Sequence, residues 1–427
     1  MTRLAWNFGP PFVGQEISAI MPPRESITEF LECVFCDKKY PADVFRLFCP
    51  ACQEPLLVSP PKNDRAFHLD QSLTVSRFAD FLPLDKIHSR LSLGEGGTPL
   101  VRLGNIMKKT GLPPIFAKNE TMNPTASFKD RGTVVAVHKA VSFGLSKVGT
   151  VSTGNMAGST AAYAAKAGLM SFIFVKEDTS PEKIAAAGIY GPALFRVRGD
   201  YGQLFQKSFS IGRRFGIYFM NSVDPYRIDG YKTTGYEILL QLESRPPRYI
   251  FVPVSAGGHL IGLMRAFQDM KDEGLISAYP VFVGVQAAGC APLARAFAQR
   301  RTRFSRFPHP KTIAHAISNP NPPGGNIVLK MIREHRGALI SVSDAEILRA
   351  QKQLAEEEGI FCDPASATTL AGLLRLAGQS KFHGRDSSVL IITGSGLKTI
   401  EDMDLSTVRL RATALDQLES RIETVLS

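Results

Sequence analysis

The sequence predicts an α/β protein in which parallel strands alternate with crossover helices. From about Ile115 onward, short apolar runs alternate with helix-like segments, a pattern typical of parallel sheets. Several runs end in turns rich in Gly, Ser and Thr, at residues 152–155, 255–258 and 393–396. Because ligands of open α/β sheets bind outside the carboxyl ends of the strands, these turns form the predicted ligand site. The apolar runs are residues 148–151, 171–175, 249–254, 281–285 and 389–392.

The length and composition indicate a folded enzyme with more than one domain. The 427 residues are enough for two or three domains, and an apolar share of 44% is ordinary for a globular protein. Residues 1–26 lack the unbroken apolar core of a secretory signal. No run approaches the roughly 18 apolar residues needed to cross a bilayer. We therefore expect a cytoplasmic protein without a membrane partner.

The net charge of +11 is compatible with an anionic small-molecule substrate. Its densest basic stretch, residues 300–311, has no recognisable nucleic-acid motif beside it. We interpret this stretch as a solvated loop, and nucleic acid is not an expected partner.

Four of the six cysteines form two C-x2-C pairs that predict a metal site. Cys33 and Cys36 are separated from Cys49 and Cys52 by twelve residues, a spacing that suits four thiolates around a tetrahedral zinc ion. Four protein ligands leave zinc no open position for water, so the expected zinc is structural. The alternative is a set of free thiols in a small core.

The segment from Lys118 to Gly132 carries the candidate catalytic residue. Asn-Pro-Thr at residues 123–125 predicts a turn, Ser127 is expected to cap the following helix, and Lys129 falls in the first turn of that helix. The helix dipole and desolvation would lower the pKa of this lysine, which suits an amine nucleophile. Taken alone, such a lysine is more often a surface residue.

A second candidate is the turn after the apolar run at residues 249–254. Its backbone N–H groups, at the start of a predicted helix, can bind a phosphate. By itself this Ser-x-Gly-Gly pattern is also typical of an ordinary strand-to-helix turn. The turn consists of Ser255, Ala256, Gly257, Gly258 and His259.

Together these segments resemble the tryptophan synthase β-chain-like, or fold type II, family of pyridoxal-phosphate enzymes, and within it the threonine synthases. The resemblance extends from about Gly94 to Lys398. It rests on GEGGTPL at residues 94–100, NPTASFKDRG at 123–132, STGN at 152–155, DPASA at 363–367 and TGSGLK at 393–398. It implies two open parallel-sheet α/β domains with pyridoxal 5'-phosphate in the cleft between them.

The resemblance also implies the domain boundaries. The chain would consist of an N-terminal extension (1–30), a zinc-ribbon-like module (31–60) and a catalytic region (64–427), with Pro60, Pro61 and Asn63 marking the linker. Within the catalytic region, the large domain would cover about 64–140 and 226–427, and the small domain about 141–225. The sequence does not give the oligomeric state, and a homodimer is one assembly that it allows.

The resemblance assigns roles to individual residues. Lys129 would carry the cofactor as a Schiff base, with Phe128 beside it, and Asn155 would hydrogen-bond the phenolic oxygen of the cofactor. Thr393 would face the pyridine nitrogen, where a neutral hydroxyl limits how far the ring acts as an electron sink. The turn at residues 255–259 would hold the cofactor phosphate, and Ser152, Thr153 and Asn155 would bind the substrate carboxylate.

A threonine synthase needs a second group of donors for the phosphate ester of its substrate. Asn221, Ser222 and Arg227 resemble the segment that supplies them, and an arginine fork suits a dianionic phosphate. The expected reaction converts O-phospho-L-homoserine and water to L-threonine and phosphate.

Some positions depart from the family pattern and keep alternatives open. Met156 and Ala157 replace a polar pair, His259 stands where an asparagine is usual, and Ser395 stands where a histidine is common. One alternative is a related enzyme on the same scaffold, such as a cysteate synthase-like enzyme acting on O-phosphoserine or a threonine dehydratase-like lyase. Another is a non-catalytic binding protein whose zinc module contacts nucleic acid or a partner.

Overall fold

The computed structural model describes residues 29–59, 74–84, 86–379, 386–400 and 413–426. The predicted extension up to residue 28 and the predicted linker residues Pro60, Pro61 and Asn63 lie outside this range. Among the described residues, every helix is too short or too polar to span a bilayer.

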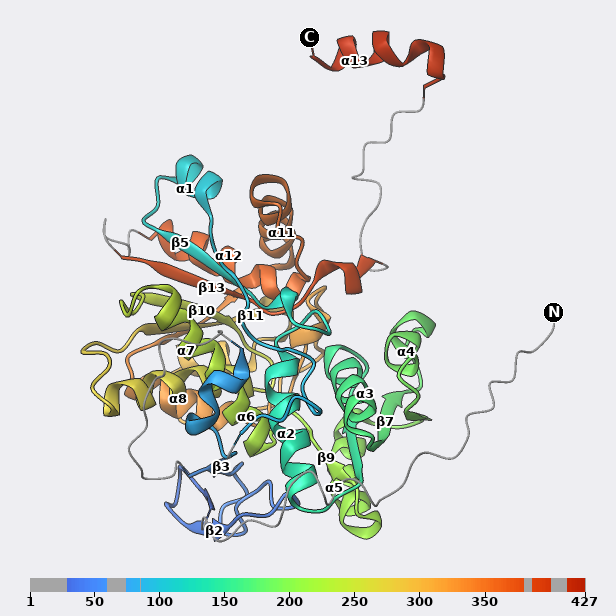
Figure 1. The fold of residues 1–427 in the computed structure, drawn as a ribbon. Helices are drawn as coiled ribbons and strands as arrows, with labels where there is room; N and C mark the ends of the chain where they lie inside the picture. Colours follow the sequence, from blue (N-terminus) through green and yellow to red (C-terminus); the bar gives the residue numbers. More distant parts are fainter. Residues whose placement is uncertain (1–28, 60–73, 85, 380–385, 401–412, 427) are drawn as a thin grey trace, which may run out of the picture.

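The larger of two α/β sheets has six strands in the order β12-β11-β10-β13-β5-β4, and every neighbouring pair is parallel except β4 and β5 (Figure 1). Alternate residues of the central strand β10 face opposite sides, as strand geometry requires. Ile250 and Val252 pack in a core with α8 (Gly258–Asp272), whereas Phe251 packs in a core with α12 (Pro364–Ala377). The strands are β4 (Leu100–Arg102), β5 (Ile115–Asn119), β10 (Tyr249–Pro253), β11 (Val281–Ala287), β12 (Ala338–Val342) and β13 (Ser388–Ile392).

The smaller sheet has four parallel strands in the order β8-β7-β6-β9. Its two faces are also covered, because Ile173 and Val175 of β7 pack with Ala157 and Ala161 of α3, whereas Phe174 packs on the opposite side. The strands are β6 (Lys147–Val151), β7 (Met170–Lys176), β8 (Ala193–Val197) and β9 (Tyr218–Phe219). They all lie within the predicted small domain, whose boundaries stay a prediction.

The helices connect and cover the two sheets. They are α1 (Gly104–Thr110), α2 (Lys129–Ser142), α3 (Asn155–Ala167), α4 (Pro181–Gly188), α5 (Tyr201–Phe215), α6 (Pro225–Gly230), α7 (Lys232–Gln241), α8 (Gly258–Asp272), α9 (Pro292–Ala298), α10 (Gly325–Glu334), α11 (Asp344–Glu358), α12 (Pro364–Ala377) and α13 (Leu418–Leu426). Short 3-10 helices are η1 (Val75–Phe81), η2 (Glu120–Met122), η3 (Ala288–Cys290), η4 (His315–Ile317), η5 (Gly396–Lys398) and η8 (Leu415–Gln417).

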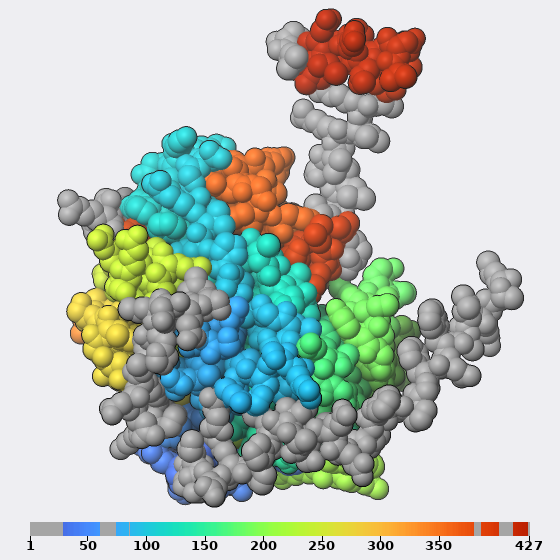
Figure 2. All heavy atoms as spheres, in the orientation of Figure 1, coloured from blue at the N-terminus to red at the C-terminus, as the bar shows by residue number. Residues whose placement is uncertain are grey.

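The cysteine-rich segment forms its own three-stranded antiparallel sheet in the order β2-β1-β3. We call residues 29–59 the cysteine module. It lies at the lower end of the body in Figures 1 and 2, where it is dark blue. Its strands are β1 (Phe30–Glu32), β2 (Lys39–Pro41) and β3 (Leu57–Val58).

Helices α2 and α6 pack closely where the chain passes between the two sheets. A Cβ atom added at Gly132 would lie 2.8 Å from the backbone oxygen of Arg227, and one added at Gly230 would collide with the backbone oxygen of Arg131. Real Cβ atoms do not approach this closely, so the contact depends on glycine on both helices.

Candidate active site

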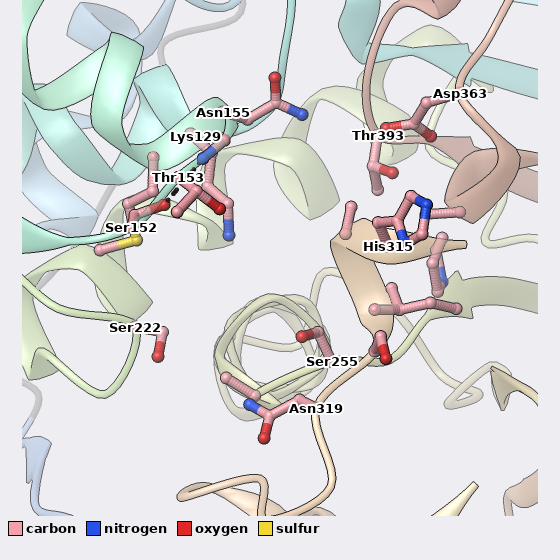
Figure 3. Close-up of a pocket in the computed structure, with 18 of the residues that line it drawn as sticks. Lys129, Ser152, Thr153, Asn155, Ser222, Ser255, His315, Asn319, Asp363 and Thr393 are labelled. Atoms are coloured by element: carbon pink, nitrogen blue, oxygen red, sulfur yellow. Dashed lines mark hydrogen bonds between the residues drawn. The ribbon is translucent and has the colours of Figure 1, made fainter. Parts of the chain in front are cut away.

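The carboxyl ends of the strands open into a cavity of about 1570 Å³. The three predicted turns, after β6, β10 and β13, all line it. Lys129, Ser152, Thr153 and Asn155 lie on one side in Figure 3, and Thr393, Asp363, His315 and Ser255 lie on the other. The volume exceeds the roughly 300–1,000 Å³ of ordinary ligand pockets, so a cofactor and a substrate can both fit.

Lys129 is the first residue of α2 and is partly exposed to the cavity. Desolvation by the surrounding protein and, second, the positive charge of Arg227 lower the pKa of its amine to about 7, although Asp363 opposes the shift. The neutral amine is therefore much more abundant near neutral pH than it is in an ordinary lysine. The neutral amine is the nucleophilic form.

A buried ion network fixes the start of α2. Arg131, two residues after Lys129, donates to Glu120 of η2 at 2.6 Å and to Glu237 of α7 at 2.6 Å. Glu237 also accepts from Lys118 of β5 at 2.6 Å, and these side chains are fully buried. Because paired charges in a low-dielectric interior are held in one geometry, the network limits movement of Lys129.

The prediction that Ser127 caps α2 is wrong. Phe128 is the residue before the helix, no side chain caps it, and the buried hydroxyl of Ser127 has no hydrogen-bond partner among the described residues. Ser127 instead forms an antiparallel bridge with Gly394, which follows β13. Ala126 before it adopts a positive φ of 53°.

The amide of Asn155 is oriented by a lysine to which the sequence analysis gave no role. Lys398 donates from Nζ to Oδ1 of Asn155 at 3.0 Å and also to the backbone oxygen of Thr125. Because Oδ1 accepts this bond, the donor end of the amide is left to bind an acceptor. Lys398 is the last residue of the TGSGLK segment, and this position was the sequence signal that could have identified it as a site residue.

Thr393 also has partners that the sequence analysis did not assign. Its hydroxyl lies 2.9 Å from Oγ of Ser366, which in turn donates to Asp363 at 2.6 Å. Burial raises the pKa of the Asp363 carboxyl to about 6, so it is mostly ionised at pH 7 and accepts this bond. The three side chains form a chain of hydrogen bonds that ends at the cavity.

The turn before α8 is shaped to receive an anion. Gly257 has a φ of 101°, and a Cβ atom there would lie 2.9 Å from Val328. A Cβ atom at Gly258 would lie 2.9 Å from the backbone oxygen of Ser222. The missing side chains let Val328 and Ser222 pack directly against the turn. The turn lines the cavity at the start of a 15-residue helix, where free N–H groups and the helix dipole favour negative charge.

His259 extends this turn with an imidazole that has no partner. The side chain is 6% exposed, its ring stacks on Phe128 at a centroid distance of 3.9 Å, and neither ring nitrogen has a hydrogen-bond partner among the described residues. Burial and the charge of Lys129 hold the pKa of His259 well below its ordinary value. The ring is therefore neutral and can both donate and accept a hydrogen bond.

The three predicted phosphate-binding residues do not occupy equivalent places. Ser222 lines the cavity, whereas Asn221 and Arg227 do not. The side chain of Asn221 accepts from the backbone N–H of Val151 at 3.0 Å and donates to Ser208 at 3.0 Å. Asn221 thus holds the end of β6, from which the turn at 152–155 follows.

Arg227 lies one layer behind the cavity wall. Its guanidinium is fully buried and donates to Thr133 at 2.9 Å, to Tyr231 at 3.2 Å and to the backbone oxygen of Lys129 at 3.4 Å. Its Nε has no hydrogen-bond partner, and it forms no ion pair within the described part of the chain. The charge of Arg227 opposes the burial that raises the pKa of the Asp224 carboxyl, but the guanidinium forms no direct ion pair, so its buried positive charge is suited to an anionic ligand.

The basic stretch interpreted as a solvated loop belongs in part to the cavity wall. Arg303 is exposed, with 61% of its side chain accessible, but Arg306 lines the cavity. Residues 306–323 supply eleven lining residues, among them His315 and Asn319, which the sequence analysis did not predict. No compact motif marks this wall, because it is defined by packing against distant elements.

Comparison with known proteins agrees with this geometry. Residues 91–394 match the family described as pyridoxal-phosphate dependent enzymes. The chain belongs to this family. It is 35% identical over 372 residues to a threonine synthase of Methanocaldococcus jannaschii, covering 86% of this chain and 92% of that protein. It is also 35% identical over 368 residues to a threonine synthase of Methanosarcina acetivorans, covering 85% and 90%.

Solved structures show the same fold at lower identity. The processed form of threonine deaminase isoform 2 from Solanum lycopersicum has a TM-score of 0.61 at 19% identity, over 76% of this chain and 82% of that chain. Maize serine racemase has a TM-score of 0.61 at 21% identity, over 77% and 94%. The predicted fold type II α/β architecture is thus confirmed.

The cavity fits the cofactor of a pyridoxal-phosphate dependent enzyme. A partly neutral lysine amine, a glycine turn at a helix start and an oriented asparagine amide all line one cavity. These groups offer an attachment point, a phosphate site and a hydrogen-bond donor. The unpartnered ring nitrogens of His259, which also lines the cavity, leave further polar atoms for a ligand.

The cysteine module brings the four predicted metal ligands together. The Sγ atoms of Cys33, Cys36, Cys49 and Cys52 all lie within 4.8 Å of one another. The Cys33–Cys52 and Cys36–Cys49 pairs are 3.3 and 3.6 Å apart. Zinc–sulfur bonds of about 2.3 Å place tetrahedral sulfurs roughly 3.8 Å apart, close to these spacings.

Proposed function

We propose that this enzyme is a threonine synthase that converts O-phospho-L-homoserine and water to L-threonine and phosphate. The observation that carries the proposal is the 35% identity to a threonine synthase over 92% of the length of that protein. In this chain Lys129, the turn at 255–259 and the polar turns after β6 and β13 line one cavity. Pyridoxal phosphate, when bound, withdraws electrons from the bonds at the substrate α-carbon.

Lys129 would attach the cofactor and then move protons. Its amine, with a pKa of about 7, can take a proton from the substrate Cα atom and return one at neutral pH. Repeated proton transfer at Cα and Cβ allows phosphate to leave Cγ, after which water adds at Cβ. The hydrogen-bonded network around Arg131 keeps the amine in position for these transfers.

The remaining residues would bind and orient. Ser152, Thr153 and Asn155 are the proposed carboxylate ligands, and their backbone lies at the start of α3, where N–H groups favour an anion. The turn at 255–259 is the proposed site of the cofactor phosphate, and Phe128 and Thr393 would contact the cofactor ring.

The substrate phosphate would bind near Ser222 and Arg227. Arg227 supports this assignment because its buried charge has no acidic partner among the described residues. A change of its side-chain conformation would be needed for direct contact, since Lys129 and Tyr231 separate it from the cavity. Asn221 would support the site by holding β6.

The zinc ion is part of the same proposal. We infer one structural zinc per chain at Cys33, Cys36, Cys49 and Cys52, because their thiols converge within 4.8 Å in a module too small to fold well on apolar burial alone. A reducing compartment such as the cytoplasm would keep the thiols available for metal. A homodimer stays a prediction that light scattering of the purified protein tests.

A substrate panel tests the proposed reaction. The purified enzyme is incubated separately with O-phospho-L-homoserine, O-phospho-L-serine and L-threonine, and phosphate and amino-acid products are measured. Phosphate and threonine from the first substrate are expected. Turnover of phosphoserine alone would favour the β-replacement alternative, and breakdown of threonine alone would favour a lyase.

A further inference from the structure

One wall of the active-site cavity consists of a long segment with little regular structure. Residues 303–326 follow α9 and extend into the first turn of α10, and η4 is the one helix or strand that lies wholly within them. We call this stretch the wall segment. Because a loop of this length does not hold one conformation through its own ladder of hydrogen bonds, its position depends on anchors from other elements.

The cysteine module supplies an anchor at both ends of the wall segment. Oε1 of Glu54 accepts from Nη1 of Arg303 at 2.9 Å and from Nδ2 of Asn326 at 2.9 Å. Asn326 in turn accepts from the backbone N–H of Phe304 at 3.3 Å. One carboxylate therefore ties the first and last residues of the wall segment together.

Glu54 is itself held by the cysteine cluster. It follows Cys52 by two residues, and its backbone oxygen accepts from the N–H of Cys49 at 2.8 Å. The residue is 5% exposed, so water competes little for its carboxylate. The position of this carboxylate thus depends on the fold of the loop that carries two of the four cysteines.

The module also makes contacts that fix it to the body of the protein. The backbone oxygen of Val58 accepts from Arg265 of α8 at 2.5 Å. On another side, Phe48 packs edge-on against Phe209 of α5 at a centroid distance of 5.6 Å. The module is therefore attached to helices beside both sheets, and these contacts hold the backbone that carries Glu54 in place.

We propose that Glu54 is a positioning residue through which the cysteine module sets the substrate side of the active-site cavity. The wall segment lines the cavity with residues such as Arg306, His315 and Asn319, whereas the proposed cofactor attachment at Lys129 lies on a different element. Its contact with the turn at 255–259 is a separate bond from the N–H of Gly324 to the backbone oxygen of Ala256, which does not involve Glu54. Loss of Glu54 should then weaken substrate binding and leave the cofactor in place. The expected change in KM for the substrate rests on the proposed threonine synthase function.

The test compares full-length, cofactor-loaded Glu54→Ala with the wild type. Removing the acceptor leaves the half-buried amide of Asn326 without its partner, whereas water can replace the carboxylate at the exposed Arg303; losing a hydrogen bond to a charged group typically changes an equilibrium by about tenfold. We expect KM for O-phospho-L-homoserine to rise about tenfold, with kcat, cofactor absorbance and zinc content unchanged. Glu54→Gln keeps an oxygen acceptor and should restore part of the loss.

The matched control is Glu32→Ala, because Glu32 lies in the same module but bonds Ser59 within the module at 3.0 Å. Its KM should equal that of the wild type. If Glu54→Ala does not fold, Arg303→Met is tested in its place. The Arg303 side chain is 61% exposed, and its replacement removes one of the two hydrogen bonds to the Glu54 carboxylate. Arg303→Met is also expected to raise KM.

Hydrogen exchange gives a readout that does not depend on turnover. In Glu54→Ala, amides of residues 303–326 should exchange faster than in the wild type, while those of α8 should not change. An unchanged KM together with unchanged exchange would overturn the inference, as would loss of cofactor or zinc in parallel with activity. A wild type that releases no phosphate from O-phospho-L-homoserine refutes the proposed function instead, and exchange then decides the inference.

Discussion

Replacing Arg227 by methionine removes a buried positive charge beside the proposed catalytic lysine while keeping most of the side-chain volume. Two effects are expected. The pKa of Lys129 should rise above about 7, because Arg227 is the largest cause of its lowering after desolvation. Binding of the substrate phosphate should weaken, because the guanidinium is the buried cation without an acidic partner next to the site.

The size of the second effect follows from the contacts of Arg227. Its present partners are a hydroxyl, a phenol and a backbone carbonyl, all neutral, so a phosphate would be its first anionic partner. A hydrogen bond to a charged group contributes about 1.5–3 kcal/mol. Arg227→Met should therefore lower kcat/KM for O-phospho-L-homoserine by about 10- to 150-fold.

Arg227→Lys separates direct contact from the effect of charge. It keeps the positive charge but lacks the planar fork that binds phosphate through two parallel bonds. The pKa of Lys129 should stay near its wild-type value in this variant, while kcat/KM still falls. Tyr231→Phe is the control, because it removes one acceptor of Arg227 and leaves the charge; its kcat/KM should fall less.

Two assays measure these outcomes. Initial rates at low substrate give kcat/KM, and the pH dependence of cofactor uptake by the apoenzyme reports the Lys129 amine. Since only the neutral amine reacts, a raised pKa moves the midpoint of uptake to higher pH in Arg227→Met. Unchanged kcat/KM in Arg227→Met, or loss of cofactor from it, would refute the role of Arg227 as a substrate-phosphate ligand.

Three further variants or treatments test other parts of the site. Lys129→Ala should keep the fold but abolish turnover, and reduction with borohydride followed by peptide mapping should find the cofactor on Lys129 in the wild type; attachment to another lysine contradicts the assignment. Removing metal from the cysteine cluster should loosen the module and spare the cofactor, whereas a preparation never exposed to chelator that contains no zinc by elemental analysis contradicts the metal site. Lys398→Met should lower kcat about tenfold and shift the absorption of bound cofactor, because the amide of Asn155 loses a charged partner; an unchanged spectrum argues against this role.

The parts of the site that the sequence predicted are local in the chain. The cysteine pairs, the turn before Lys129 and the Gly257–Gly258 turn each lie within a few residues, and local geometry places their functional atoms. Ser127 was misassigned because its backbone pairs with Gly394, a partner that no local pattern reveals. Tertiary contact overrode a favourable capping residue.

Other features depend on packing between distant segments and could not be predicted. The sequence suggested Arg227 as a phosphate ligand, but not that it lies behind Lys129 and Tyr231 without an acidic partner. The basic stretch at residues 300–311, which overlaps the start of the wall segment, was interpreted as a solvated loop because of its charge. Its contact with Glu54, about 250 residues earlier, gives it a defined place.

The glycine contact between α2 and α6 has a consequence for movement of the enzyme. Backbone meets backbone at Gly132 and Gly230, so moving one helix relative to the other would break close packing contacts. Lys129 at the start of α2 and Arg227 in α6 should therefore move as one rigid unit. The electrostatic influence of the arginine on the amine then stays the same when other parts of the cavity wall move.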